Sequence, residues 1–302
     1  MVPRSPFKTV EGQTEFLAAY DAVMELWSVP YEEVTVASRF GATHVVVSGP
    51  QGAPPLVLLH GFMNTLMMWL PNVEDLSKGY RVYAIDTMGH PSKSVPDEPI
   101  RNAADFADWL ASTLDELSLD RVSLAGISHG GWVALNYAVA SPERVEKLIL
   151  LSPAASFQPI SKRFLLRTML TFLPPKHRRF ISMMRWMGLE ETPGDKLTGP
   201  LLDLIWLGGM HFRMPPETRR VMGNVFSDDE LRSLPMPVLL LVGEDEVIYD
   251  PTKALSRAEQ VIPEFEGDLI PGGRHAMSFN QKEAVDARML EFLQEQRGPS
   301  RP

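Results

Sequence analysis

The sequence has no cysteine among its 302 residues. Disulfide bonds, thiolate metal sites and a cysteine nucleophile are therefore excluded, although this absence does not fix the cellular compartment. No apolar run approaches the 18 residues of a transmembrane helix, and the first residues lack the apolar stretch of a signal peptide. We therefore expect a cytoplasmic protein with no stable membrane insertion.

Positive charge is also scarce in this chain. Lysine and arginine number 29 against 38 aspartates and glutamates, which gives a formal net charge of −9. Excess negative charge argues against nucleic acid as a partner. No residue spacing is typical of a metal site and no glycine-rich loop fits a dinucleotide-binding fingerprint, so we expect no cofactor.

Short apolar runs alternate with longer amphipathic segments, and 44% of the residues are hydrophobic. This alternation predicts an α/β fold with a mostly parallel, twisted sheet that helices cover on both faces. An antiparallel hairpin is expected to precede the parallel strands. The predicted strands are 34–39, 43–48, 56–60, 81–86, 121–125, 146–152, 237–243 and 266–270. The predicted helices are 14–27, 103–117, 131–140, 252–262 and 281–295.

The alternation of strands and helices breaks between Ser152 and Leu234. This stretch of about 80 residues is too long for one crossover connection, and it is rich in helix-forming residues. We predict a helical cap at 153–234, inserted after the sixth strand, on a core formed by residues 1–152 and 235–302. A cap in this position would roof a substrate pocket.

A sharp strand-to-helix turn is predicted at residues 126–130, which read Gly-Ile-Ser-His-Gly. An apolar run precedes the turn and a helical pattern follows it, as in a nucleophile elbow. Such a turn strains the central serine and requires small residues two positions before and after it, which Gly126 and Gly130 provide. Ser128 is therefore the predicted nucleophile.

A candidate base and candidate acids follow the serine in the order that this type of hydrolase requires. His275 comes on a loop after the last predicted strand, where its imidazole can accept the proton of the serine hydroxyl. The loop after strand 237–243 carries Asp245, Glu246 and Asp250. We predict that Glu246 orients His275, because the acid usually occupies the fourth position counted from the glycine. Asp245 is the alternative acid, and Asp250 is the least favoured.

Main-chain N–H groups near the serine are predicted to form an oxyanion hole, which needs two donors aimed at the developing negative charge. One donor is expected from His129, directly after the nucleophile. The strand at 56–60 ends in His-Gly-Phe-Met. The second donor is expected from Phe62, with Met63 as the alternative, because Gly61 lets the backbone turn close to the site.

These residues together resemble the α/β-hydrolase superfamily, from about Val34 to the end of the chain. The turn at 86–93 is similar to the Asp-x-x-Gly-x-Gly-x-Ser turn of that superfamily. It departs from the pattern because Pro91 replaces the second glycine and Lys93 replaces the serine. The resemblance implies the fold, the triad and the oxyanion hole described above.

Within the superfamily, the loop at 243–249 with Glu246 looks like that of bacterial carboxylesterases of the naproxen-esterase type. This resemblance implies a serine esterase that hydrolyses small-molecule carboxylic esters through an acyl-enzyme. Hydrolysis of C–C bonds, amides or lactones, perhydrolysis, and a non-catalytic ligand-binding role remain open alternatives. Ser128 excludes dehalogenases and epoxide hydrolases, which need an aspartate at the elbow. A homo-oligomer is also compatible with the sequence.

The segment 154–189 contains seven lysines and arginines but no aspartate or glutamate. Removing these seven charges from the net charge of −9 leaves −16 on the remaining residues. Either the segment packs against an acidic surface of the body or another subunit, or it attracts anionic substrates or an anionic membrane surface. The cations are Lys162, Arg163, Arg167, Lys176, Arg178, Arg179 and Arg185.

The other histidines are predicted to have no catalytic role. His44 lies in the N-terminal hairpin and is expected to be exposed. His177 and His211 are expected on the surface or in the packing of the cap. His60 and His90 follow strand ends near the predicted site, where structural hydrogen bonds are expected and a contact with the ligand is the alternative.

Overall fold

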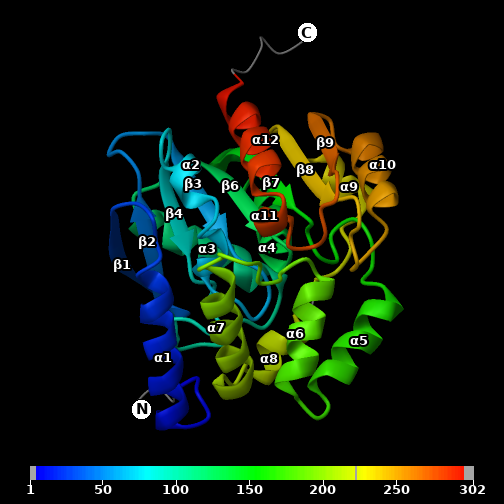
Figure 1. Ribbon diagram of the computed structural model, residues 1–302. Helices are drawn as coiled ribbons and strands as arrows, with labels where there is room; N and C mark the ends of the chain where they lie inside the picture. The colour runs from blue at the N-terminus through cyan, green and yellow to red at the C-terminus, as the bar shows by residue number, and fades with distance from the viewer. Residues whose placement is uncertain (1–4, 222, 296–302) are drawn as a thin grey trace.

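The computed structural model describes residues 5–221 and 223–295. Residues 1–4, on which the expectation of no signal peptide partly rests, lie outside this range. A β-sheet crosses the middle of the molecule, and helices cover both of its faces (Figure 1). The strands are β1 (Tyr31–Ser38), β2 (Gly41–Ser48), β3 (Pro55–Leu59), β4 (Arg81–Ile85), β5 (Val95–Pro96), β6 (Val122–Ile127), β7 (Val145–Leu151), β8 (Val238–Gly243) and β9 (Phe265–Ile270).

The strands lie in the order β1-β2-β4-β3-β6-β7-β8-β9, with the short β5 paired to β2. β1 and β2 form the predicted antiparallel hairpin, in which Ser38 is opposite Gly41, and β2 is also antiparallel to β4. All neighbours from β4 to β9 are parallel. The two-residue β5 was not predicted, so the predicted sixth strand is β7 of the structure.

The direction of the chain across the sheet reverses between β3 and β6. From β3 the chain moves outward to β4, then returns to place β6 on the other side of β3. In open parallel sheets, ligands bind at such a switch point, outside the carboxyl ends of the strands. The loops that follow β3 and β6 therefore leave the sheet side by side at the position where a site is expected.

β3 shows how the sheet is buried on both faces. Leu56 and Leu58 belong to one hydrophobic cluster, whereas Val57 and Leu59 belong to a second cluster on the opposite face. Successive side chains of a strand point to opposite faces, so a strand covered on both sides needs a continuous apolar run. The first cluster includes side chains of α1 (Val10–Met24) and α12 (Lys282–Gln294), and the second includes those of α3 (Ala103–Glu116), α4 (His129–Ala140) and α10 (Pro251–Val261).

The first helix begins four residues earlier than predicted. Thr9 lies in an extended conformation and its side chain accepts a hydrogen bond from the N–H of Gly12, so it caps α1 at Val10. Short elements that the sequence did not predict are η1 (Leu66–Trp69), α2 (Val73–Leu76), η2 (Pro142–Arg144) and α11 (Met277–Asn280). Of the helices in the described ranges, none has the length and apolar character needed to cross a membrane.

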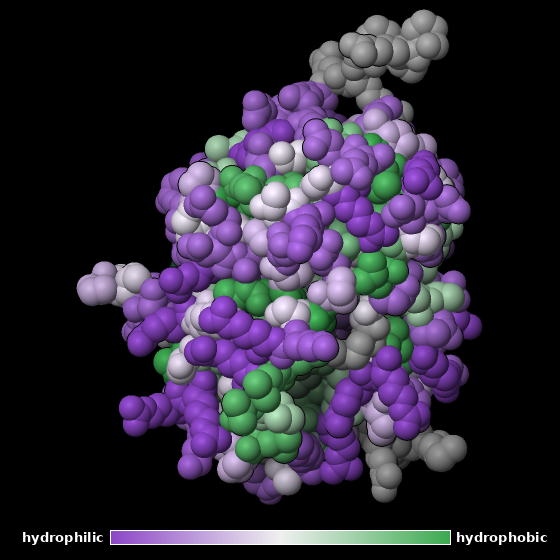
Figure 2. Space-filling view, turned by 90° about the vertical axis from the view of Figure 1, so that its right-hand side faces the viewer, coloured by the Kyte–Doolittle hydropathy of each residue, from purple (hydrophilic) through white to green (hydrophobic). Residues whose placement is uncertain are grey.

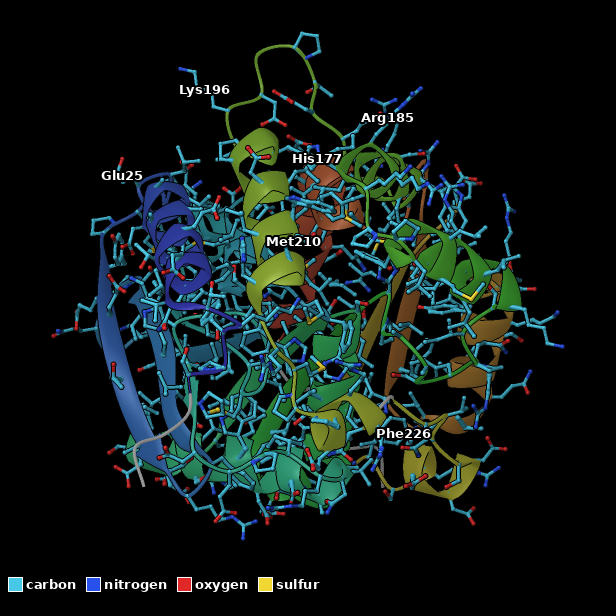
Figure 3. All side chains as sticks on the ribbon, turned by 90° about the horizontal axis from the view of Figure 1, so that it is seen from below. Glu25, His177, Arg185, Lys196, Met210 and Phe226 are labelled. Carbon is cyan, nitrogen blue, oxygen red and sulfur yellow. The ribbon has the colours of Figure 1, made fainter. Side chains whose placement is uncertain are left out.

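Between β7 and β8 the chain leaves the sheet and forms a group of helices. Figure 3, seen from below, shows α1, α7, α6 and α5 in this order, with His177 and Arg185 on α6 and Met210 on α7. α7 packs on α1, and α5 packs on α6, whereas α9 packs on α10 beside the sheet. These helices are α5 (Lys162–Phe172), α6 (His177–Trp186), α7 (Thr198–His211), α8 (Pro216–Arg220) and α9 (Asp228–Arg232).

Candidate active site

Ser128 occupies a strained turn between β6 and α4. Its φ of 54° and ψ of −115° fall in a region that residues with a side chain rarely adopt. A Cβ atom on Gly126 would lie 2.3 Å from the carbonyl oxygen of Gly130, and a Cβ atom on Gly130 would lie 2.3 Å from that of Leu59. Only glycine fits at both positions, so the predicted elbow is present as a backbone feature.

His275, on the loop after β9, meets the hydroxyl of Ser128. The His275 Nε2 atom lies 2.8 Å from Ser128 Oγ, and both residues are more than nine-tenths buried. The loop that carries the imidazole is fixed on one side by the N–H of Ala276, which donates to the carbonyl oxygen of Met187 at 2.8 Å. The nucleophile and the base predicted from the sequence are therefore in hydrogen-bond contact.

The side chain of Glu246 is fully buried behind His275. Its two carboxylate oxygens lie 3.1 and 3.0 Å from His275 Nδ1, and Oε1 also accepts the N–H groups of Val247 and Ile248 at 2.8 Å. Burial by itself raises the pKa of Glu246, but the charge and hydrogen bond of His275 hold it below its usual value. A charged Glu246 places the proton of His275 on Nδ1, which leaves Nε2 as an acceptor for the Ser128 proton.

The two alternative acids lie elsewhere on the same loop. The side chain of Asp245 is exposed, and its backbone N–H donates to the carbonyl oxygen of Gly273 at 2.8 Å. Asp250 caps α10, where its carboxylate accepts the N–H of Lys253 at 3.1 Å. The structure thus brings Glu246, and neither aspartate, to His275.

The loop after β3 passes beside the serine. A Cβ atom on Gly61 would lie 3.5 Å from Ser128 Cβ, so the backbone of this loop runs within contact distance of the nucleophile. The N–H of Met63 donates to His90 Nδ1 at 3.1 Å and is therefore occupied. No acceptor in the described residues takes the N–H of Phe62, and the N–H of His129, at the start of α4, has no partner within the helix. These two groups match the expected oxyanion donors better than Met63 does.

Two buried histidines hold this loop in place. His60 Nε2 accepts the N–H of Thr87 at 2.9 Å, so its Nδ1 carries the proton and donates to the carbonyl oxygen of Gly61 at 2.8 Å. Burial lowers the pKa of His60 and lowers that of His90 well below its ordinary value. Both rings are neutral, and both make the structural hydrogen bonds expected from their positions.

The imidazole of His129 adds a third neutral ring to this side of the site. Burial lowers the pKa of His129 to about 3. The ring stacks on Trp132 and meets the edge of Phe62, with centroid separations of 5.7 and 5.8 Å. The side chain of Phe62 is 42% exposed, so it forms an apolar rim above the buried imidazoles.

The prediction that His44 is exposed is wrong, because its side chain is buried. His44 Nδ1 lies 3.0 Å from the carboxylate of Asp86, and Nε2 lies 2.8 Å from that of Glu33. Tyr20 of α1 covers the ring and donates to Asp86 at 2.8 Å. Lys93 stands where the superfamily turn has a serine, and its ammonium group pairs with Glu33 at 2.8 Å. Residues far apart in the sequence therefore bury this histidine.

The two histidines between β7 and β8 lie away from the serine. His177 is about half exposed and lies 3.9 Å from the carboxylate of Asp203. His211 pairs with Glu15 of α1 at 3.1 Å. Neither ring contributes to the arrangement around Ser128.

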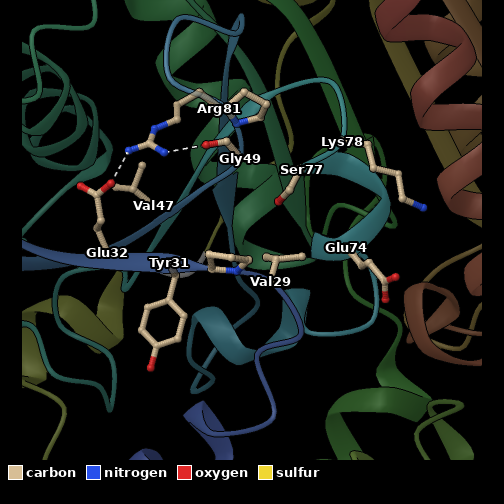
Figure 4. A pocket seen from close by; sticks show the side chains of 11 residues that line it. Val29, Tyr31, Glu32, Val47, Gly49, Glu74, Ser77, Lys78 and Arg81 are labelled. Carbon is tan, nitrogen blue, oxygen red and sulfur yellow. Dashed lines mark hydrogen bonds and ion pairs between the residues drawn. The ribbon is translucent and has the colours of Figure 1, made fainter.

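A separate cavity of about 430 Å³ lies where β2 ends, beside Val47 and Gly49 and away from Ser128 (Figure 4). Arg81 lies on its wall, where the guanidinium donates to Glu32 at 3.0 Å and to the carbonyl oxygen of Gly49 at 2.6 Å. None of the residues that line the cavity belongs to the Ser128 arrangement.

Comparison with known proteins connects this geometry to a family. Residues 56–288 match the alpha/beta hydrolase family. The chain is 34% identical over 296 residues to carboxylesterase YbfK of Bacillus subtilis, covering 95% of this chain and 96% of that protein. It is 35% identical over 292 residues to the uncharacterized carboxylesterase nap of the same organism, covering 95% and 94%. The crystal structure of naproxen esterase from Bacillus subtilis superposes with a TM-score of 0.86 at 33% identity, covering 95% of this chain and 99% of that one.

Proposed function

Because this chain belongs to the alpha/beta hydrolase family, we propose that it hydrolyses carboxylic esters through an acyl-enzyme formed on Ser128. The observation that carries this proposal is the hydrogen-bonded series from Ser128 Oγ through His275 to the buried carboxylate of Glu246. The carboxylesterase names of two relatives support the choice of ester substrates.

In the first step, Ser128 Oγ attacks the ester carbonyl carbon while His275 Nε2 accepts the hydroxyl proton. Negative charge moves to the carbonyl oxygen, where the N–H groups of Phe62 and His129 stabilise it. Glu246 stabilises the imidazolium that forms. The tetrahedral intermediate then expels the alcohol, which takes the proton from His275 and leaves the acyl group on the serine.

In the second step, water enters the site left by the alcohol. His275 Nε2 accepts a proton from this water, which attacks the acyl carbonyl, and the same donors hold the oxyanion. Collapse of the second intermediate returns the proton to Ser128 and releases the carboxylic acid. Serine, histidine and glutamate complete the cycle without a cofactor.

In our proposal, the helices between β7 and β8 form the cap of this site. The cap consists of residues 153–234, and the core consists of residues 1–152 and 235–302. The end of α6 reaches the loop of the base, where Met187 accepts the N–H of Ala276 at 2.8 Å. This contact joins the cap to the residue next to His275, and we expect the cap to select the acyl and alcohol groups.

The experiment that tests the proposal is hydrolysis of p-nitrophenyl esters from acetate to palmitate. We expect turnover that disappears in Ser128→Ala, with a chain-length optimum set by the space under the cap. Ser123→Ala is the matched control, because it removes a hydroxyl from the same strand without touching the site. Absence of turnover on every ester would contradict the esterase proposal and favour the C–C bond, amide or binding alternatives.

A further inference from the structure

The outer side of α5 is apolar and faces solvent. The exposed apolar face consists of residues that are 48–71% exposed: Leu165, Leu166, Met169, Leu170 and Leu173. Thr171 is the residue of α5 that is buried. A surface helix normally turns its apolar side to the core. In α5, Phe164 packs against the core and Thr171 is buried, but these five large apolar side chains face solvent.

The exposed apolar face is continuous. Leu165 and Met169 are one helical turn apart, and so are Leu166 and Leu170, so the two pairs form adjacent rows on one side of the helix. Figure 2 looks at the side of the molecule where α5 lies and shows apolar side chains gathered in the lower half among hydrophilic ones. Contiguous exposed apolar surface on a folded protein marks an interaction site.

Cations surround this face. Lys162 and Arg163 lie on the first turn of α5, and Lys176 and Arg178 lie at the start of α6, all of them exposed. Of the seven cations of the segment, Arg185 pairs with a carboxylate, that of Glu190 at 3.1 Å. For the other six, no carboxylate of residues 5–221 or 223–295 lies within 4 Å. Arg163 and Arg167 lie over the ring of Trp186, and Arg179 donates to the carbonyl oxygen of Leu170. The positive charge of the six side chains therefore has no counter-ion among the described residues, and Lys162, Lys176 and Arg178 are exposed to an outside partner.

We propose that the exposed apolar face and its cations dock this protein onto an anionic lipid bilayer. α5 lies in the plane of the interface, with its leucines at the boundary of the acyl chains and its cations among the anionic headgroups. The rest of the chain carries a formal charge of −16 outside the segment 154–189 and is repelled by the same surface. This asymmetry of charge orients the protein with α5 toward the bilayer.

A second copy of the chain fits this face less well. In a symmetric dimer the same patch meets itself, so the unpaired cations of one copy would face those of the other. Like charges placed together at an interface oppose association. An anionic bilayer supplies both an apolar layer and negative charge, and it matches both properties of the face.

The test is co-sedimentation of the full chain with vesicles of phosphatidylcholine alone and of phosphatidylcholine mixed with phosphatidylglycerol. We expect binding to the anionic vesicles, weakened by salt, and little binding to the neutral ones. The double variant Leu166→Glu with Leu170→Glu should lose binding. The double variant Lys162→Gln with Arg178→Gln should bind anionic vesicles about 25-fold more weakly, since each cation near such a surface contributes about fivefold.

Leu269→Glu is the matched control, because Leu269 is a 39% exposed leucine on β9, outside α5. It should bind anionic vesicles as the unchanged protein does. Ser128→Ala should also bind fully, which separates docking from catalysis. Circular dichroism and the thermal midpoint establish that each variant is folded.

Two outcomes would overturn the proposal. The first is that the folded protein does not bind anionic vesicles, or that the double glutamate variant binds them as tightly as the unchanged chain does. The other is a dimer in light scattering that the double glutamate variant dissociates while vesicle binding is absent, which would assign the face to a second copy.

Discussion

Within residues 5–221 and 223–295, two histidines pair with buried carboxylates, one behind the elbow serine and one beneath α1. In the first, Glu246 lies 3.0 Å from His275 Nδ1, and in the second, Asp86 lies 3.0 Å from His44 Nδ1. Both carboxylate side chains are fully buried. The shortest separation is therefore the same in both places, although Glu246 meets Nδ1 with both of its oxygens and Asp86 with Oδ2 alone.

The two pairs differ in what the second ring nitrogen faces. His275 Nε2 meets the hydroxyl of Ser128, whereas His44 Nε2 meets a second carboxylate, that of Glu33, each at 2.8 Å. Burial alone lowers the pKa of His44, but the two carboxylates raise it above its ordinary value. Because both ring nitrogens of His44 face carboxylate oxygens, both donate and the ring is a cation, whereas His275 keeps a nitrogen for the serine proton. A histidine–carboxylate pair becomes a base only where a reactive hydroxyl completes it.

Replacing each histidine by glutamine should give the largest difference in kcat between the catalytic pair and the structural pair. We expect His275→Gln to lower kcat by about 10⁴- to 10⁶-fold, because the serine loses its proton acceptor. His44→Gln should leave kcat of the folded enzyme within a few fold. The measurement is steady-state hydrolysis of a p-nitrophenyl ester by both variants. Equal losses in the two variants would remove the distinction between the pairs.

Replacing the acid of the first pair should have the next largest effect on turnover. Glu246→Gln keeps the size of the side chain but no longer fixes the tautomer of His275, so kcat should fall by about 10²- to 10⁴-fold. Asp245→Asn is the control on the same loop and should be mild. If Asp245→Asn proves damaging and Glu246→Gln mild, the assignment of the acid is wrong.

Replacing the acid of the second pair should act on stability instead. Asp86→Asn leaves the cationic His44 without one of its two counter-charges in a buried position, so the free energy of unfolding should fall by about 3–5 kcal/mol. Denaturant unfolding of the variant and the unchanged chain measures this difference. A loss of kcat with unchanged stability would instead tie Asp86 to catalysis.

The pH dependence of stability gives the smallest expected effect. The raised pKa of His44 means that its contribution is complete below the ordinary value of 6.5 and is lost as pH rises through the higher value of the folded state. The free energy of unfolding of the unchanged chain should therefore decline above pH 6.5 more than that of His44→Gln. Parallel stability curves for the two proteins across this range would show that His44 is not held as a cation.

Local sequence signals were sufficient to predict the fold and the elements on which the candidate residues lie. The apolar run before Ser128 and the glycines around it encode the elbow within five residues, and the family and fold that they predicted are confirmed by the comparisons. The catalytic roles of Ser128, His275 and Glu246 stay predictions that the geometry supports.

Long-range contacts explain which predictions from the sequence were wrong or incomplete. His44 is buried because Tyr20 packs on its ring and Asp86 binds its Nδ1 atom, and neither residue is near it in the sequence. The choice between Asp245 and Glu246 depends on the path of one loop, which the contact of Asp245 with Gly273 fixes. The amphipathic pattern of α5 indicates an apolar side but not whether that side meets the core or the solvent.

The most direct test of the central claim is rapid-quench mass spectrometry of the intact enzyme during turnover of p-nitrophenyl butyrate. The acyl-enzyme mechanism predicts a mass increase of one butyryl group, located on the peptide that contains Ser128 and absent from Ser128→Ala. An adduct on another residue, or full turnover by Ser128→Ala, would contradict it.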